Sequence, residues 1–360
     1  MGSFATVEFR DYQIKKIDFN TNIFKLDQAY SATHIIPPPP ALEGITKGKW
    51  TLRDSNFAVS YPDAAQKIEW FYGQETGDSV DGVVTINASA IQSLLSHTGP
   101  INLDQYDLQI TAENFFNILT TQIEKTYYQN AQNVTTNEPK AILKDLLPKV
   151  LDTAFALDKI KLIKIMFTFL NQKEIQLFVN NSQIEAAILG QKWGGKVMET
   201  SSDYLLINNT NLSEAKSSLN IKESLEHKVT EGEGVVTAKL TVLRVHDGSA
   251  VWPDGTDRNY QRILVPYGAV LQSATLNGKN VMAKVELGEE SGKTYFGIIT
   301  ETAPQAKSLV ELTYTLPIHY GDYSLTIQKQ SGSFGDPLVV QKDGTIIFQG
   351  VLREDMRLTP

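Results

Sequence analysis

The sequence contains no cysteine among its 360 residues. This absence excludes disulfide bonds, catalysis by a thiolate and zinc sites built from cysteine. Secreted eukaryotic proteins commonly use disulfides, so a chain without cysteine fits better with a bacterium, either in the cytoplasm or at the cell surface.

Long hydrophobic runs are also missing. No stretch approaches the roughly 20 apolar residues of a membrane-spanning helix, and no signal peptide is visible. A strand-like segment, residues 3–9, begins directly after Met1 and Gly2. Because a natural start rarely opens inside a core strand, we expect that a preceding segment has been removed and that it can hold an anchor.

The chain has fewer basic than acidic residues, and it has few histidines. The chain has 33 Lys and Arg against 41 Asp and Glu, a net charge of −8. Nucleic-acid-binding proteins normally have a basic face, so nucleic acid is not an expected partner. The five histidines lack the spacing of a metal site: His34, His97, His227, His246 and His319. Neither a Gly-x-Ser-x-Gly elbow nor a Walker-type loop occurs.

The N-terminal half alternates between strand and helix patterns. Residues 3–19 predict a β-hairpin, and the four prolines at 37–40 predict an extended connector. Apolar residues recur at helical spacing in 63–72 and 88–96, on either side of the β-branched run 80–86, which is typical of a buried strand. This alternation predicts an α/β fold, with a parallel or mixed sheet and helices on both faces.

Helices are also predicted after residue 111 and over 138–170. Thr111 and Asn114 form a variant of the capping box. The second region is rich in lysine, and we interpret those lysines as a solvated face. A strand follows at 175–179, a helix at 182–189 and another strand at 203–208.

The pattern changes near residue 215. From there, many short strand-like runs are separated by Gly, Pro, Asn and Asp, as at Asn277-Gly278 and Asp343-Gly344. Many strands without long helices indicate a β-sandwich, which we expect to be immunoglobulin-like. We therefore predict an α/β domain over 1–213 and a β-sandwich domain over 214–360.

Several motifs along the chain resemble a known bacterial family. They occupy residues 37–40, 52–57, 61–63, 80–83, 94–95, 98–100, 260, 265–269 and 328–332. In these motifs the chain is similar to domain-of-unknown-function family 4012 (DUF 4012) over nearly its whole length. The resemblance implies an envelope protein that faces outward, with an N-terminal membrane anchor, often encoded near polysaccharide-export genes. The family has no settled activity.

The segment 51–100 has a second, weaker likeness. Arg53-Asp54, a helix, a strand with Asp81, a second helix and a turn at Gly99 together resemble the core of LytR–CpsA–Psr enzymes. Those enzymes transfer lipid-linked glycans to peptidoglycan and hold a polyprenyl pyrophosphate with arginines and magnesium. The resemblance implies Arg53 and Asp54 as catalytic residues and Asp54 as a metal ligand. It also implies Asp63 and Asp81 as ligand-binding residues.

The chemistry of these residues supports two interpretations. Arginine pairs two phosphate oxygens at once, and Mg²⁺ takes carboxylates together with phosphate oxygens. However, the next arginine after Arg53 is Arg244, and residues 111–170 contain lysine only. The simplest interpretation is that Arg53 and Asp54 form a structural pair. Asp81 can face a cleft at the edge of the sheet, or equally cap a turn where Gly82 permits tight packing.

An acidic loop lies within the predicted sandwich, at residues 246–257. Calcium can bind such loops, but EF-hand spacing is absent and a solvated loop is the simpler interpretation. Trp252 and Tyr260 can stack on a sugar or cover the end of the sandwich.

The sequence therefore predicts a surface-exposed cell-envelope protein of unproven activity that binds glycan or a lipid-linked glycan precursor. One alternative is a magnesium-dependent transferase that moves polyprenyl-pyrophosphate-linked glycopolymer to the cell wall. Another is a surface adhesion module that uses the sandwich. Magnesium is expected as a cofactor only for the transferase.

Overall fold

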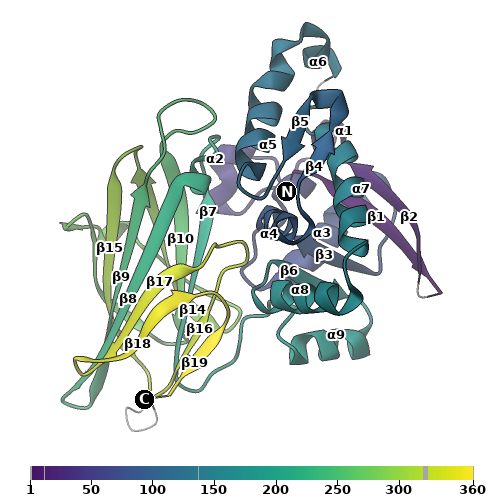
Figure 1. The fold of residues 1–360 in the computed structure, drawn as a ribbon. Helices are drawn as coiled ribbons and strands as arrows, with labels where there is room; N and C mark the ends of the chain where they lie inside the picture. Colours follow the sequence, from purple (N-terminus) through teal and green to yellow (C-terminus); the bar gives the residue numbers. More distant parts are fainter. Residues whose placement is uncertain (1, 12, 137, 319–322, 360) are drawn as a thin grey trace. The chain divides into compact units, whose positions relative to one another are not determined.

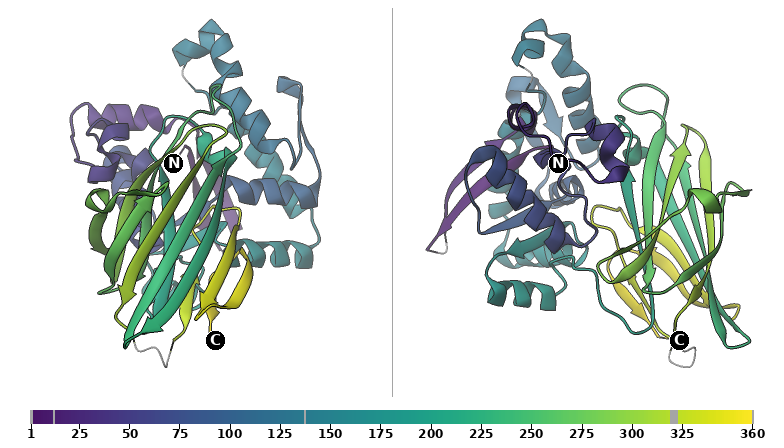
Figure 2. Two further views of the ribbon diagram at one scale, coloured as in Figure 1. Left: turned by 90° about the vertical axis from the view of Figure 1, so that its left-hand side faces the viewer. Right: turned by 180° about the vertical axis from the view of Figure 1, so that it is seen from behind.

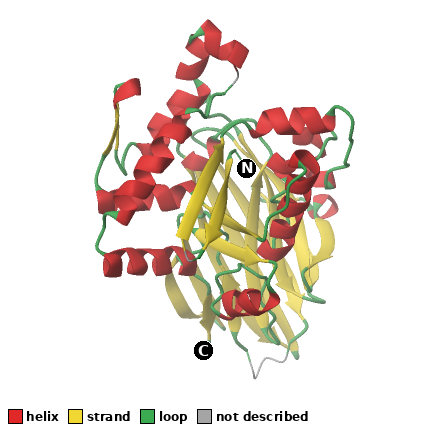
Figure 3. Cartoon of the chain, turned by 90° about the vertical axis from the view of Figure 1, so that its right-hand side faces the viewer, coloured by secondary structure: helices red, strands yellow, loops and turns green. Residues whose placement is uncertain are grey.

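The computed structural model describes residues 2–11, 13–136, 138–318 and 323–359. His319 and position 12 of the predicted hairpin lie outside them. The chain divides into two compact units, the first comprising Met1–Leu170 and Glu174–Gly194, the second Asn171–Lys173 and Gly195–Pro360. Figure 3 shows that the helices gather in the first unit, whereas strands make up most of the second.

The first unit is built mainly from helices (Figure 1). Its α-helices are α1 (Ile23–Ser31), α2 (Glu43–Thr46), α3 (Tyr61–Thr76), α4 (Ala88–Thr98), α5 (Phe115–Glu124), α6 (Ala131–Thr136), α7 (Ile142–Phe155), α8 (Lys159–Asn171) and α9 (Ser182–Gly190). Its strands are β1 (Phe4–Arg10), β2 (Gln13–Asn20), β3 (Gly82–Ile86), β4 (Ile101–Leu103), β5 (Leu108–Ile110) and β6 (Ile175–Val179). A short 3-10 turn, η2 (Leu52–Asp54), precedes α3.

Several local predictions are confirmed in this unit. β1 and β2 form the expected antiparallel hairpin, with an irregularity between Glu8 and Phe9, and Figure 2 shows it projecting from the helices of the same unit. The capping box before α5 is reciprocal: the Thr111 amide donates to Asn114 Oδ1 at 2.8 Å, and the Asn114 amide donates to Thr111 Oγ1 at 3.3 Å. These features depend on neighbouring residues alone.

Strand pairing in the first unit differs from the parallel or mixed sheet that we expected there. β3 runs antiparallel to β6, and β4 runs antiparallel to β5. Val84 and Ile86 are more than half exposed, so β3 is not a strand buried between helices. A Cβ on Gly82 would collide with the Phe178 carbonyl of β6, which supports the tight-packing interpretation of that glycine.

The second unit consists almost entirely of strands. They are β7 (Asp203–Asn211), β8 (Ile221–Gly232), β9 (Val235–His246), β10 (Asp257–Pro266), β11 (Val270–Leu276), β12 (Lys279–Asn280), β13 (Glu286–Glu290), β14 (Lys293–Thr302), β15 (Lys307–Leu316), β16 (Leu325–Gln328), β17 (Asp336–Lys342), β18 (Thr345–Leu352) and β19 (Met356–Leu358). One sheet has the order β13-β14-β10-β7-β16-β19, and the other β12-β11-β15-β9-β8-β17-β18. Both sheets are mixed, because β16 runs parallel to β7 and β17 parallel to β8.

The two sheets of the second unit share one hydrophobic core. Along β9, inward positions alternate with outward ones, and Val236, Ala238, Leu240 and Val242 are buried on the inward side. They belong to the same cluster as side chains of β7, β10, β14 and β16 in the opposite sheet. Alternation with a period of two thus packs one face of each sheet against the other.

The division between the units falls at Gly194–Gly195 rather than at the predicted 213/214. β7, which we assigned to the N-terminal domain, pairs with β10 and β16 in the second unit. Its inner residues Leu205 and Ile207 join the core of that unit. The sequence therefore predicted the strand β7 correctly, but it did not predict which strands pair with β7.

The shared core predicts that truncating two leucines of the second unit has very different effects on the free energy of unfolding. Leu240 is completely buried, whereas Leu287 is 62% exposed. Leu240→Ala should lower the free energy of unfolding by about 2–5 kcal/mol through lost contacts and a residual cavity. Leu287→Ala should change it by less than about 0.5 kcal/mol. Urea unfolding of the two variants measures both values, and equal losses would contradict the assignment of the core.

Candidate functional site

Arg53 and Asp54, the predicted catalytic pair, lie together in η2 and contact each other. Arg53 Nε is 3.3 Å from Asp54 Oδ2 and 3.7 Å from Asp27 Oδ2 of α1. The guanidinium carbon also lies 4.2 Å from the ring centre of Phe24. Arg53 thus combines two ion pairs with a cation–π contact, and 27% of its side chain remains exposed.

A third acid, Glu75, adds to the negative charge around Arg53. Glu75, near the end of α3, accepts a hydrogen bond from the Leu52 amide at 2.8 Å and interacts with Asp27. Burial raises the pKa of Glu75 to about 7 and also raises the pKa of Asp27. A proton held between these carboxyls lets one donate to the other, which removes a like-charge repulsion.

The residues around Arg53 do not fit a pyrophosphate. A single guanidinium is surrounded by the carboxyls of Asp27, Asp54 and Glu75. The site therefore lacks the cluster of cations that a pyrophosphate requires. In the part of the chain that the structure describes, no group of three or more His, Asp or Glu side chains is arranged to hold a metal ion.

The two predicted ligand-binding aspartates lie on other elements. Asp63 is exposed in the first turn of α3, where a carboxylate complements the positive end of the helix dipole. Asp81 is exposed in the bend before β3, and its carbonyl accepts a hydrogen bond from the Asn180 amide at 2.8 Å. Both positions have a structural explanation in the local backbone.

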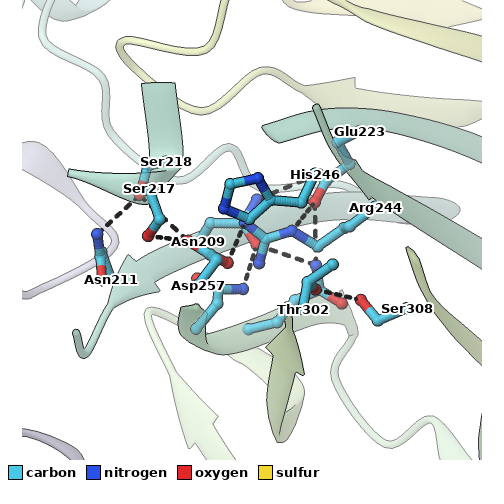
Figure 4. Close-up of polar contacts among 12 residues, drawn as sticks. Asn209, Asn211, Ser217, Ser218, Glu223, Arg244, His246, Asp257, Thr302 and Ser308 are labelled. Carbon is cyan, nitrogen blue, oxygen red and sulfur yellow. Dashed lines mark hydrogen bonds and ion pairs between the residues drawn. The ribbon is translucent and has the colours of Figure 1, made fainter. Parts of the chain in front are cut away.

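Sequence reasoning missed a buried polar network at one end of the second unit (Figure 4). Arg244 lies on β9. Its Nη2 atom is 3.1 Å from Asp257 Oδ2 of β10, and its Nε atom is 3.5 Å from Glu223 Oε2 of β8. Asn209 donates to both oxygens of Glu223 at 3.1 Å, and Ser217 donates to Asp257 Oδ1 at 3.1 Å. The network connects strands of both sheets.

The charges in this network are deeply buried. Arg244 is 4% exposed and Asp257 is fully buried. Burial raises the pKa of Glu223 to about 7, while the Arg244 charge acts to lower it. Arg244 Nη1, Gln261 Oε1 and Thr300 Oγ1 have no hydrogen-bond partner among the described residues. Such atoms are usually satisfied by internal water.

The loop between β9 and β10, residues 247–256, lies next to this network and is tied down at both ends. Gly248 N donates to His246 Nδ1 at 3.0 Å, so His246 Nε2 carries the proton that it donates to the Gly255 carbonyl at 2.8 Å. Asp254 accepts hydrogen bonds from the Ser249 amide at 2.6 Å and from Asn220 at 2.9 Å. Asp254 is thus used to order the loop.

This loop presents Trp252 at the surface, with 45% of the residue exposed. Tyr260, the other aromatic residue that we considered for sugar stacking, is buried and donates to Glu286 at 2.8 Å. Only Trp252 of the two can therefore offer a ring face to a ligand.

A further buried pair lies elsewhere in the second unit. His227 Nε2 is 2.8 Å from Asp203 Oδ2, which also accepts a hydrogen bond from Tyr323 at 3.0 Å. All three side chains are buried, so they support the strands rather than face a substrate.

One sequence signal could have revealed the Arg244 network. β9 alternates apolar inward residues from Val236 to Val242, and the same alternation continues to Arg244 and His246. A charged residue at an inward position demands a buried partner. The sequence does not say which strand supplies it.

Comparison with known proteins finds one family model that matches the first part of the chain. Residues 1–123 match the sequence model described as "Protein of unknown function (DUF4012)". The N-terminal part of the chain thus carries a DUF4012 region, which confirms the resemblance there. The motifs that we identified at 260 and beyond lie outside the match. No curated protein matches the chain.

Solved structures resemble the chain only loosely. A protein assigned as nutrient-binding from Legionella pneumophila has 12% identity over 39% of this chain and 53% of its own, with a TM-score of 0.27. The M1 zinc metallopeptidase of Deinococcus radiodurans has 14% identity over 34% and 31%, with a TM-score of 0.21. Yeast LTA4 hydrolase has 6% identity over 39% and 29%, with a TM-score of 0.22. The chain spans about half or less of each, and similarity this low carries no functional argument.

The raised pKa of Glu75 predicts a pH-dependent stability. Between the ordinary carboxyl pKa and about 7, the folded state binds more protons than the unfolded state, so stability falls as pH rises through this window. Glu75→Gln cannot ionise at this position, so we expect the melting temperature of this variant to fall less between about pH 5 and pH 8 than that of the wild type. Parallel thermal melts measure the difference, and identical slopes for wild type and variant would refute it.

The buried position of Arg244 predicts a strong dependence of stability on this residue. Arg244→Met leaves Glu223 and Asp257 buried without their cation and should cost about 3–5 kcal/mol. The matched control is Arg258, whose ion pair with Glu301 is largely exposed. Arg258→Met should cost about 0–1 kcal/mol. Urea unfolding compares the two, and adding Glu223→Gln to Arg244→Met should restore part of the loss.

Proposed function

We propose that this chain is a surface-exposed module of a bacterial cell envelope that binds glycan, or a lipid-linked glycan precursor, without catalysing a reaction. The observation that carries the proposal is the ordered loop 247–256, which holds Trp252 at the surface. Carbohydrate sites commonly pair an exposed aromatic ring with hydrogen-bonding groups, because the apolar face of a sugar stacks on the ring.

The loop is well suited to this role because its base is fixed. Arg244 and Asp257 lie on the two strands that the loop connects, and their ion pair holds those strands together. A ring held on a preorganised loop loses little conformational entropy on binding. Asp247 and Ser249, on the same loop, are exposed polar residues that can hydrogen-bond sugar hydroxyl groups.

The envelope location is part of the proposal and is supported by the DUF4012 match over residues 1–123. At a finer level, we propose that the first unit is related to LytR–CpsA–Psr domains and that the second is immunoglobulin-like. The support is the Arg53-Asp54 turn before α3 in one case and two sheets around one core in the other.

The transferase alternative has less support, because three carboxyls already surround Arg53. It predicts that polyprenyl pyrophosphate with Mg²⁺ raises the melting temperature of the wild type but not of Arg53→Ala. The adhesion alternative would use the same exposed loop with a protein surface as its ligand.

Titration with oligosaccharides released from bacterial cell-wall polysaccharide tests the proposal. We expect saturable binding by calorimetry, and Trp252→Ala should weaken it about tenfold, since a stacked ring contributes roughly one kcal/mol or more.

The matched control is Trp70→Ala, which removes another tryptophan with a comparable exposed fraction, 41%. The affinity of the Trp70→Ala variant for the oligosaccharides should equal that of the wild type. Absence of saturable binding, or full binding by Trp252→Ala, would overturn the proposed site.

A further inference from the structure

α8 presents an apolar stripe to solvent in addition to its buried face. Ile165 and Phe169 are buried in the core of the first unit. On the opposite side, Ile160, Ile163 and Phe167 are 65%, 54% and 47% exposed. Residues spaced by three and four lie on one face of a helix, so these three side chains form a continuous stripe.

Another exposed aromatic residue precedes α8 in the chain. Phe155, at the end of α7 just before α8, is 62% exposed. The centres of the Phe167 and Trp193 rings are 5.4 Å apart. Isolated exposed apolar residues are ordinary, but a stripe of large ones along a single helix indicates a surface that contacts a partner.

Lysines flank the stripe on both sides. At 100° per residue, Lys159 falls beside Ile163 on one edge, and Lys164 falls beside Ile160 on the other edge. Both are exposed. Lys161 lies one turn before the buried Ile165 and donates to the His97 carbonyl at 3.3 Å, so it does not border the stripe. Long lysine side chains can rest along apolar surface while their ammonium groups reach an anionic layer.

The charge of α8 is opposite in sign to the net charge of the whole protein. The helix, KIKLIKIMFTFLN, has three lysines and no acidic residue, whereas the chain carries −8 overall. Its thirteen residues are too few to cross a bilayer. No helix in the described part of the chain has the length and apolar character needed to span a membrane.

We propose that the exposed stripe of α8, with Lys159 and Lys164 at its edges, docks on the surface of an anionic lipid membrane. The apolar residues enter the boundary between headgroups and acyl chains, and the lysines contact the negative headgroups. A basic amphipathic helix that lies parallel to the surface has this distribution of residues. The proposal does not depend on glycan binding at Trp252.

Vesicle co-sedimentation of the full chain tests the inference. Vesicles of phosphatidylglycerol mixed with phosphatidylcholine should bind the protein, and added salt should weaken the binding because it screens the lysines. Ile160→Ser/Ile163→Ser should weaken binding about tenfold, because less apolar surface is buried. Lys159→Gln/Lys164→Gln should weaken it about fivefold for each charge removed.

A matched control uses an exposed leucine and an exposed lysine of the second unit. Leu287→Ser/Lys284→Gln removes the same kinds of group and should leave vesicle binding unchanged. Unchanged melting temperatures of all variants exclude loss of folding as the cause.

Three results would overturn the proposal. One is absence of binding to the phosphatidylglycerol vesicles at low salt. Another is equal binding to vesicles of phosphatidylcholine alone. The third is a self-association, measured by analytical ultracentrifugation, that Ile160→Ser/Ile163→Ser abolishes, because the stripe would then be an interface between two copies.

Discussion

Arg244 joins the two sheets of the second unit from inside: its guanidinium reaches Glu223 in its own sheet and Asp257 in the facing one. Along β9 this residue continues the inward row that is apolar up to Val242. The interior therefore changes from hydrocarbon to a hydrogen-bonded polar layer at one end. The 247–256 loop starts and finishes at this layer, so its conformation depends on that buried ion pair.

Arg53 also lies among carboxyl groups, but near the surface of the first unit rather than in a buried core. Its guanidinium is partly exposed and faces carboxyls from α1, η2 and α3. The acids exceed the cation, and burial of Asp27 and Glu75 favours a protonated carboxyl. This arrangement anchors the turn before α3. A phosphate site would need cations in excess, and here carboxylates are in excess.

Local features could be predicted from sequence because they depend on neighbouring residues. The Thr111–Asn114 capping box, the β1–β2 hairpin and most strand runs of the second unit are examples. The orientation of β6 against β3 and the partners of β7 could not be predicted, because periodicity identifies a strand without specifying what pairs with it. The same limit applies to Arg244 and Asp257, which no local pattern connects.

By itself, the sequence determined a cysteine-free chain with a helix-rich first part and a strand-rich second part, since composition and hydrophobic period are local properties. It also placed Arg53 beside Asp54, and their contact follows from adjacency. Only the tertiary structure decided that Asp27 and Glu75 join them, that β7 belongs to the second unit, and that Trp252 is exposed while Tyr260 is buried. Each of these outcomes depends on which distant segments pack together, and that is fixed by the burial of whole faces rather than by any short stretch of residues.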